Sequence, residues 1–463
     1  MADTINDRAD IRKQEIEVYE EQKAVMKQEC VTHNEQIHQL NQENLKLKQE
    51  ILALKEQSRK RKKKIPAIIV AVIIVFVVIF ADNVFGRAIV TFDDEYFKWA
   101  VRREIHRPFG HLRQRDLRQI TRISSSSGSR IQDISPVRYM ISLEWLILWH
   151  NEISDVSALS GLKNLTRLEL LANRRISDIS ALQGLTNLER LWLGYNEISD
   201  IDALQNLTNL RALRLDYNKI DDISALKGLI NLTELWLNNN EISDISALSH
   251  LANNLEILYL HDNRISDIDA LQSLINLRVL QLDNNEINDL GALHELSNLR
   301  TLGLNNSGIG DISTLQSLTN LIRLESRNNE ISDISALQEL TNLEWLWLKN
   351  NEISDINALQ NLTNLDWLEL SVNEISDISA LAGLTNLRNL CLDDNNISDV
   401  SALHGLTNLR VLSLSYNNIS DISTLKEMTY LRSLSLHNNP ISHDDIQALR
   451  RALPNTSILY CYC

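Results

Sequence analysis

Hydrophobic residues recur with a period of 22 positions along most of the chain, from Met140 to about His443. Each block approximates the pattern L-T-N-L-x-x-L-x-L-x-x-N-x-I-S-D-I-S-A-L-x-x. One block cannot bury its own leucines, whereas stacked blocks form a continuous apolar column. The fourteen blocks begin at Met140, Leu162, Leu185, Leu207, Leu229, Leu251, Leu274, Leu296, Leu318, Leu340, Leu362, Leu384, Leu406 and Met428, and two contain one extra residue, at Arg174-Arg175 and Asn253-Asn254.

The central part of each block, L-x-x-L-x-L-x-x-N-x-I, is the signature of leucine-rich repeats. It predicts an α/β fold, namely a leucine-rich-repeat solenoid in which each repeat adds one short strand to a curved parallel β-sheet. Residues 140–442 are expected to form these repeats. Residues 87–139 are expected to form a helical N-terminal cap with a degenerate first repeat, and residues 443–463 a C-terminal cap.

A heptad pattern precedes the repeats, over residues 9–57 within a predicted domain 1–64. Isoleucine at position a, leucine at position d and one asparagine at position a favour a parallel two-stranded coiled coil. The alternative is a single solvated helix rich in Glu, Gln and Lys. The residues expected to form the dimer seam are Ile37, Leu40, Asn44, Leu47, Ile51 and Leu54.

A run of six basic residues, Arg59–Lys64, is followed by 17 uncharged residues, Ile65–Ala81, of which 13 are Ile, Val or Phe. Such a run is long enough for a short membrane span, and Val84 and Phe85 extend it, so residues 65–86 are predicted to be a transmembrane helix. A cleaved signal peptide would not follow 64 residues of chain. The basic flank predicts a single-pass cell-membrane protein with a cytoplasmic N-terminus and extracytoplasmic repeats.

The repeats resemble a known family. The Ile-Ser-Asp-Ile-Ser-Ala-Leu and Leu-Thr-Asn-Leu segments resemble the internalin-type leucine-rich repeats of bacterial surface proteins, and the segment from Val90 to Arg102 is similar to their helical cap. The resemblance implies protein binding on the concave face and no catalysis. No Ig-like domain and no wall-sorting signal is recognised after the repeats, so the family's role in host-cell invasion is not part of the expectation.

The residues that flank and separate the paired leucines are expected to project from the concave face, because side chains alternate along a strand. Seven of the eight tryptophans fall at these positions. Large exposed aromatic and arginine side chains commonly supply interface energy, although aromatic residues also suit exposed strands. The candidate ligand-binding residues are Trp145, Trp149, Arg167, Arg190, Trp192, Arg214, Trp236, Tyr259, Arg323, Arg327, Trp345, Trp347 and Trp367. A protein or peptide ligand is expected, with a glycan as the alternative.

Charge and motif content argue against nucleic-acid binding, metal binding and catalysis. The net charge of −15 argues against a nucleic-acid partner, which needs a clustered basic face. The four cysteines are too scattered to predict a disulfide framework or a zinc site. No nucleophile elbow, phosphate loop or metal spacing is present. We therefore expect no enzyme activity, no cofactor and no metal.

Two columns of polar residues accompany the leucines, an asparagine in thirteen of the fourteen blocks and an aspartate after Ile-Ser in thirteen. Both are expected to satisfy backbone groups at turns. The repeat weakens at residues 296–330, where Ser307 replaces the asparagine and Ser326 replaces a leucine. A softer joint between two contact patches is one hypothesis for this segment, and neutral drift is the other.

Together these features predict a membrane-anchored protein that binds a protein partner through its repeats. The alternatives are a structural envelope or surface scaffold and, if the topology is inverted, an intracellular regulatory scaffold.

Overall fold

The computed structural model describes residues 88–125, 130–252, 254–287 and 289–460. Residues Gly86–Cys463 form one compact unit. The predicted coiled coil (1–64) and the predicted transmembrane helix (65–86) lie outside the described residues. In the part of the chain that is described, no helix is both long enough and apolar enough to cross a membrane.

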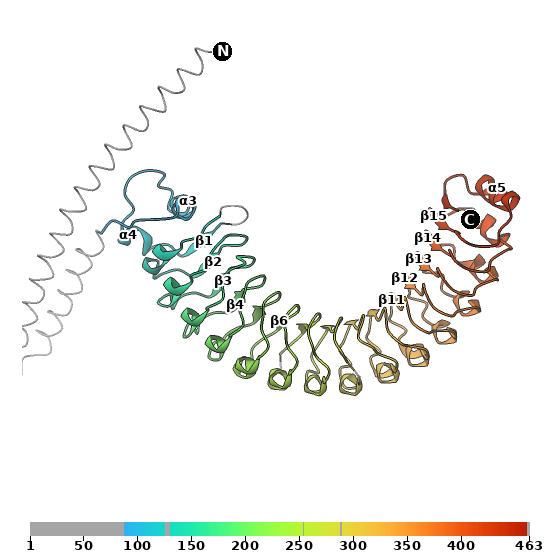
Figure 1. The fold of residues 1–463 in the computed structure, drawn as a ribbon, viewed down its shortest axis with the longest axis horizontal. Coiled ribbons are helices and arrows are strands. Elements are labelled where there is room, and N and C mark those ends of the chain that lie inside the picture. The colour runs from blue at the N-terminus through green and yellow to red at the C-terminus, as the bar shows by residue number, and fades with distance from the viewer. Residues whose placement is uncertain (1–87, 126–129, 253, 288, 461–463) are drawn as a thin grey trace, which may run out of the picture. The chain divides into compact units, whose positions relative to one another are not determined.

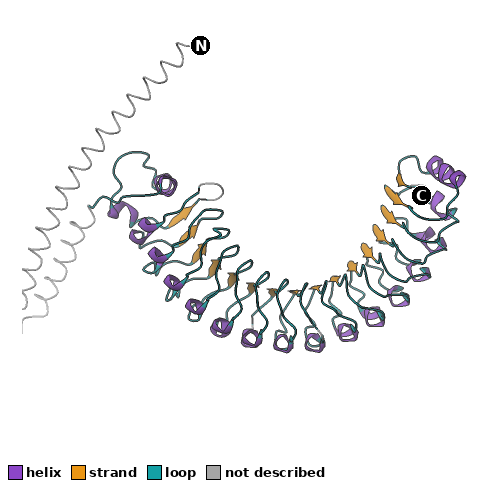
Figure 2. Ribbon diagram, in the orientation of Figure 1, coloured by secondary structure: helices purple, strands orange, loops and turns teal. Residues whose placement is uncertain are grey.

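One parallel sheet of sixteen strands, hydrogen-bonded in chain order, runs through the described residues. Its strands follow the inner side of a curved solenoid, and short helices follow the outer side (Figures 1 and 2). The strands are β1 (Arg122–Ser124), β2 (Trp145–Ile147), β3 (Arg167–Glu169), β4 (Arg190–Trp192), β5 (Ala212–Arg214), β6 (Glu234–Trp236), β7 (Ile257–Tyr259), β8 (Val279–Gln281), β9 (Thr301–Gly303), β10 (Arg323–Glu325), β11 (Trp345–Trp347), β12 (Trp367–Glu369), β13 (Asn389–Cys391), β14 (Val411–Ser413), β15 (Ser433–Ser435) and β16 (Ser457–Leu459).

The outer side consists mainly of short 3-10 helices formed by the Ser-Ala-Leu segments. They are η1 (Ser135–Tyr139), η2 (Ser157–Leu159), η3 (Ser180–Leu182), η4 (Asp202–Leu204), η5 (Ser224–Gly228), η6 (Ser246–Leu251), η7 (Asp269–Leu271), η8 (Gly291–Leu293), η9 (Ser313–Ser317), η10 (Ser335–Glu339), η11 (Asn357–Leu359), η12 (Ser379–Leu381), η13 (Ser401–Gly405) and η14 (Thr424–Glu427). Because a 3-10 turn on the outer side is wider than the spacing of about 4.8 Å between neighbouring strands, the stack bends toward the strands.

The apolar positions of each repeat form one continuous core. In the repeat around β11, Leu346 on the strand, Leu348 directly after it, and Ile353, Ile356 and Leu359 on the return path are at most 2% exposed. The pairing is in strict register, so the central leucine of each strand meets its counterpart in the next, as Leu346 meets Leu368. Each fully buried aliphatic side chain contributes roughly 1.5–3 kcal/mol before conformational entropy is subtracted. The predicted solenoid with a curved parallel sheet is therefore confirmed.

The asparagine column satisfies backbone groups, as expected. Asn351 is representative: its Oδ1 accepts from the backbone N–H of Ile331 at 3.1 Å, and its Nδ2 donates to the carbonyls of Ser326 and Leu348 at 2.8 and 3.0 Å. The side chain thus hydrogen-bonds both its own repeat and the preceding one. These bonds satisfy groups at the turn that the three-residue strands leave unpaired.

The aspartate column caps the entry to the outer helices. In all thirteen repeats that carry this aspartate, its Oδ1 accepts from the backbone N–H two residues later, at 2.7 or 2.8 Å. This is the Asx turn, in which a short acidic side chain replaces a backbone acceptor. The column is therefore a structural device that recurs at the start of each 3-10 helix.

The described ends of the solenoid are covered by helices. Helix α3 (Glu95–Glu104) begins at the N-cap Asp94, whose Oδ1 accepts from Phe97 N at 2.8 Å and whose Oδ2 accepts from Gln132 N at 2.6 Å. Helix α4 (Gln114–Leu117) leads into β1, which pairs with β2. At the other end, α5 (His443–Ala452) is capped by Ser442 and precedes β16. Buried side chains such as Phe97 and Leu449 complete the core at these ends.

Substitute hydrogen bonds maintain the ladder through the weakened repeat. Ser307 donates from its hydroxyl to the carbonyl of Asn305 at 3.2 Å, and Asn329 accepts from the amides of both Ser307 and Ile309. The buried hydroxyl of Ser326 accepts from Asn329 Nδ2 at 2.9 Å. Strands β9 and β10 keep the common register. The polar replacements are thus hydrogen-bonded, which favours neutral substitution over the softer joint.

Candidate functional site on the concave face

The strict register of the sheet arranges the outward side chains in columns. The first outward position of each strand lies beside the first of the next, as Trp345 lies beside Trp367, and the third positions behave alike, as Trp192 lies beside Arg214. A further outward position follows each strand and carries Trp149. The aromatic residues fall into two groups. The first cluster comprises Trp145, Trp149, Trp192, Trp236 and Tyr259, and the second comprises Trp345, Trp347 and Trp367.

In the first cluster, arginine is interleaved with aromatic rings. The guanidinium of Arg214 lies over Trp192 and over Trp236, at 5.5 and 5.2 Å from the ring centroids. Trp192 also stacks on Trp149, and Trp236 stacks on Tyr259 at 5.7 Å with an interplanar angle of 6°. Cation–π contacts contribute about 0.5–1 kcal/mol at exposed sites and about 2 kcal/mol when desolvated. The contacts hold these flat side chains in fixed orientations.

Trp145, at the start of the first cluster, lies between two arginines. Arg122 on β1 is 3.9 Å from the centroid of the Trp145 ring, and Arg167 on β3 is 5.5 Å from it. Arg122 is absent from the sequence-predicted site residues because it lies in the degenerate repeat. Aligning Ile123 with Leu146, which the register confirms, would have identified it.

The second cluster repeats this arrangement. Arg323 and Arg327 each lie 4.2 Å from the centroid of the Trp347 ring. Trp367 meets Trp347 edge to face at 5.5 Å and is the most exposed tryptophan of the concave face, at 37%. Trp345 lines an open groove of about 320 Å³ with Glu344, Asn364, Asp366, Asn386, Arg388 and Asn408.

Carboxylates neutralise most of these arginines. Within single strand segments, Arg167 contacts Glu169 at 2.5 Å, Arg214 contacts Asp216 at 3.1 Å, and Arg323 contacts Glu325 at 2.5 Å. Arg327 instead contacts Glu369, two repeats further on, at 2.6 Å. Each of these guanidinium groups is therefore held between a ring face and a carboxylate. Such a surface loses little side-chain freedom on binding.

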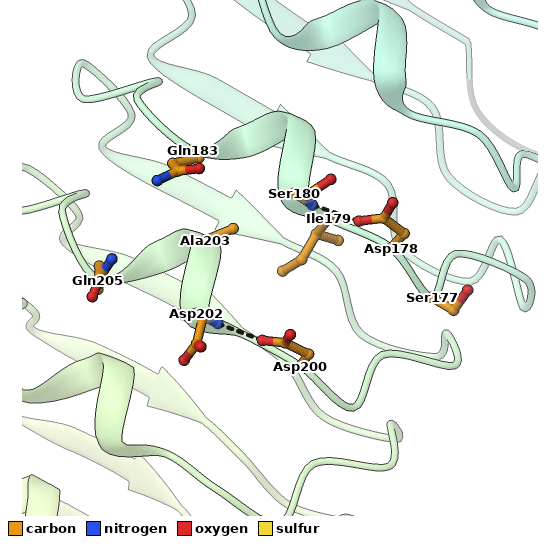
Figure 3. A pocket seen from close by; sticks show the side chains of 9 residues that line it. All are labelled: Ser177, Asp178, Ile179, Ser180, Gln183, Asp200, Asp202, Ala203 and Gln205. Atoms are coloured by element: carbon orange, nitrogen blue, oxygen red, sulfur yellow. Dashed lines mark hydrogen bonds between the residues drawn. The ribbon is translucent and has the colours of Figure 1, made fainter.

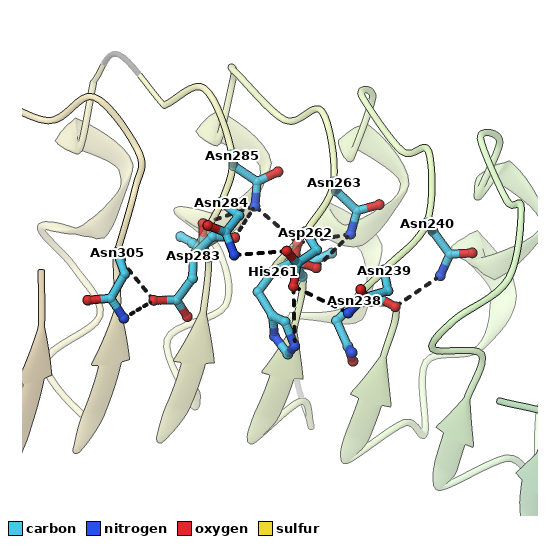
Figure 4. Close-up of polar contacts among 12 residues, drawn as sticks. Asn238, Asn239, Asn240, His261, Asp262, Asn263, Asp283, Asn284, Asn285 and Asn305 are labelled. Atoms are coloured by element: carbon cyan, nitrogen blue, oxygen red, sulfur yellow. Dashed lines mark hydrogen bonds and ion pairs between the residues drawn. The ribbon is translucent and has the colours of Figure 1, made fainter. Parts of the chain in front are cut away.

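Polar residues line the turns at the carboxyl ends of neighbouring strands, from Asn238 after β6 to Asn305 after β9 (Figure 4). Asp262 accepts from Asn239 and Asn284 at 3.3 and 2.8 Å, and Asn305 donates from its amide side chain to Asp283 at 2.5 Å. Burial raises the pKa of Asp283 above its ordinary value of 3.8, with the nearby Glu325 carboxylate adding to the effect. These hydrogen-bonded turns begin in the repeats of Trp236 and Tyr259 and continue toward the second cluster.

The structure places the candidate side chains at outward positions, but most of their rings are only half exposed because the neighbouring arginines cover them. The indole nitrogens of Trp149, Trp192 and Trp347 are buried and have no hydrogen-bond partner. Ligand contact by all thirteen candidates therefore stays a prediction. What the structure adds is the pairing of the rings with arginine and of arginine with carboxylate.

A second hollow lies on the outer side of the solenoid (Figure 3). It measures about 410 Å³ and lies between the turns that precede η3 and η4, where Asp178 bonds the amide of Ser180 and Asp200 bonds that of Asp202. These carboxylates are already engaged as turn caps. Within the described ranges, no group of three or more His, Cys, Asp or Glu side chains could hold a metal ion.

Comparisons with known proteins agree with this architecture. The model of the leucine-rich-repeat family (two copies) matches residues 141–184, 186–228, 208–253, 230–273, 253–295, 275–317, 363–404 and 407–451, together more than half of the chain. A search among curated proteins finds no match to this sequence.

Among solved structures, an internalin from Listeria monocytogenes is 34% identical, with a TM-score of 0.67, covering 69% of this chain and 94% of its own. A leucine-rich-repeat protein of Leptospira interrogans is 23% identical, with a TM-score of 0.67, covering 74% and 97%. The ectodomain of a plant membrane receptor kinase from Arabidopsis thaliana is 22% identical, with a TM-score of 0.58, covering 71% and 45%. The chain therefore belongs to the leucine-rich-repeat family, as an internalin-like protein, because its 22-residue repeats, its capped parallel sheet and these matches agree.

Proposed function

We propose that this protein is a membrane-anchored leucine-rich-repeat protein that binds a protein partner through the aromatic concave face of its repeats. The observation that carries the proposal is the interleaving of Trp192, Arg214 and Trp236, repeated by Arg323, Trp347 and Arg327. Tryptophan, tyrosine and arginine are the residues that most often dominate binding energy in protein interfaces. Rings held in place by arginines form a surface that is ordered before the partner arrives.

The fold supports this proposal by analogy with its relatives. The Arabidopsis ectodomain was solved in complex with Casparian strip integrity factor 2, so in that protein a leucine-rich-repeat ectodomain holds a partner. Mixed charge beside aromatic rings suits a protein or peptide more than a uniformly charged ligand. A glycan would also stack on Trp367, and the same variants test it.

Alanine substitution separates a binding role from a structural spacer. The triple variant Trp345→Ala/Trp347→Ala/Trp367→Ala should lose the partner while keeping the circular dichroism of the wild type. A control variant removes Ile230 and Ile275, which are apolar residues outside the strands and are more exposed than the three tryptophans, at 50% and 51%. The readout is the Kd of the purified partner after its identification by photo-crosslinking. Equal Kd values for the wild type and the triple variant would favour the spacer.

Membrane anchoring by residues 65–86 and a parallel coiled coil within 1–64 are part of the same proposal. Their support is the uncharged run after six basic residues, and the heptads with Asn44 at position a. Two linked ectodomains would raise avidity without new contacts.

Topology decides between this function and the intracellular alternative. A C-terminal tag should be digested by protease added to intact cells, because the basic flank of the apolar run orients the repeats outward. Protection of the tag until the cells are permeabilised would reverse the topology. An intracellular regulatory scaffold would then become the leading account.

A further inference from the structure

We propose that the N-terminal cap of the repeats rests on the lipid bilayer and that Tyr96, Trp99 and Phe109 enter the interfacial region of the membrane. The inference rests on the proposed membrane anchor. It adds a second membrane contact, formed by the folded cap itself, which would fix the direction in which the solenoid leaves the membrane.

The two faces of helix α3 differ in their partners. Phe97, Ala100 and Val101 are buried against the core of the repeats. Tyr96 and Trp99 are 55% and 58% exposed, and their i, i+3 spacing places them on one face of the helix. Arg103 follows on that face and lies 4.9 Å from the Trp99 ring centroid. This outer face is therefore aromatic and cationic.

The loop after α3 adds the most exposed apolar side chain. Phe109 is 86% exposed, more than any other large hydrophobic residue in the described ranges. Arg102 ties this loop to the helix, since its guanidinium donates to the carbonyls of Arg107 and Gly110 at 3.0 and 2.7 Å. With Ile89 at 42%, four of the large exposed hydrophobic residues fall within 21 positions of the chain. Such gatherings mark contact surfaces.

The positive charge of the cap indicates what contacts this surface. Residues 93–118 contain seven lysines or arginines and five acidic residues, a net charge of +2 in a chain whose net charge is −15. Glu95 pairs with Lys98 at 2.7 Å, and Asp116 lies 3.1 Å from Arg107 and 3.8 Å from Arg115, so both acids are neutralised by neighbouring cations. A symmetric contact with a second copy would oppose this cationic surface to itself. An anionic lipid surface complements it, and tryptophan and tyrosine are enriched at membrane interfaces.

The chain length also favours the bilayer. The apolar run ends at Phe85, and Ile89 lies four residues later. Four residues span at most about 14 Å. An anchor at this point therefore holds the cap within about one helix diameter of the lipid headgroups.

Tryptophan quenching by brominated lipid tests the inference on the full chain. Trp99 is the one tryptophan of eight that lies outside the concave positions. We would reconstitute the protein in vesicles of phosphatidylcholine and phosphatidylglycerol, brominated or not at shallow acyl positions. Bromine should reduce wild-type emission, and Trp99→Phe should abolish that loss. The matched variant Trp367→Phe should retain it. Tyr96→Ser/Phe109→Ser should weaken the quenching of Trp99 while leaving the circular dichroism unchanged.

Alkaline extraction of the same vesicles keeps the two proposals distinguishable. Protein that is released by alkali lacks the anchor, which would refute the proposed anchoring and this inference together. Protein that resists alkali but shows equal quenching in the wild type and Trp99→Phe would overturn this inference alone. Crosslinking of Trp99 positions between copies, without quenching, would also overturn it, because a second copy would then cover the cap.

Discussion

At the scale of single residues, the asparagine column holds successive repeats together. Asn395 accepts from the amide of Ile375 at 3.0 Å and donates to the carbonyls of Leu370, Leu392 and Asp393 at 3.0–3.3 Å. Asn395→Ala should lower the free energy of unfolding by about 2 kcal/mol or more, because it strands buried backbone groups. Asn386→Ala, which removes one exposed bond to Thr363, serves as the control in the same urea titration. Equal losses would contradict the assignment.

Cys391 provides a second test at this scale. Burial raises the pKa of its thiol from 9.0 to about 11, with Glu369 and Asp393 adding to the effect. A shift of two units lowers the thiolate fraction near neutral pH about 100-fold. Alkylation of Cys391 at pH 8, followed by peptide mass spectrometry, should therefore be about 100-fold slower in the folded protein than in urea. A folded rate within a few-fold of the urea rate would refute the assignment.

At the scale of elements, the aspartate turns should make the solenoid sensitive to acid. Hydrogen bonds from the amide and hydroxyl of Ser180 lower the pKa of Asp178 below its ordinary value of 3.8, and the turns at Asp333 and Asp377 behave alike. A depressed folded-state pKa contributes stability that is present above the unfolded value and is lost as the pH falls through the folded value.

The thermal midpoint should thus stay level above about pH 5 and fall below pH 3.8. In the variant Asp333→Asn/Asp377→Asn the amide can still accept the turn bond but does not titrate. Its deficit relative to the wild type should be visible at pH 6 and should shrink as the pH falls below 3.8. A deficit of constant size across this range would assign the loss to geometry instead of ionisation.

A second prediction at the scale of elements concerns the weakened repeat at residues 296–330. Because Asn329 bonds both Ser307 and Ile309, amide exchange over residues 296–330 should be as slow as in the repeats on either side. The measurement is hydrogen exchange read by mass spectrometry at several times. Faster exchange confined to this segment would restore the hypothesis of a softer joint.

The inward and outward positions of the strands could be predicted from the sequence because alternation fixes them: Leu346 is fully buried between the half-exposed Trp345 and Trp347. The pairings among outward side chains could not. Arg327 reaches Glu369 two repeats away instead of a nearer acid, and Arg122 covers Trp145 from a degenerate repeat. These contacts depend on rotamers and curvature, which a repeating sequence motif does not specify.

At the scale of the whole molecule, the proposed coiled coil predicts a dimer. Replacing the seam residues Leu40 and Leu47 by serine should weaken self-association of the detergent-solubilised full chain by more than about 100-fold. Leu45 and Leu52 fall outside the a and d positions, so their serine variants are the matched control. Analytical ultracentrifugation gives the readout. An unchanged dimer after the seam substitutions, or a monomeric wild type, would reject the coiled coil as the dimer interface.

The uniform register of the sheet has a consequence for how this protein can change over generations. Every described strand meets its neighbours at the same central position, as Leu280 meets Leu258 and Leu302. Loss of the block 274–295 would bring two surfaces together that already match. Near-identical blocks favour recombination between the DNA segments that encode them. Each such event would change the distance between the two aromatic clusters by about 4.8 Å, the spacing of one strand, without altering either cluster. The distance between the two aromatic clusters therefore changes only by whole repeats.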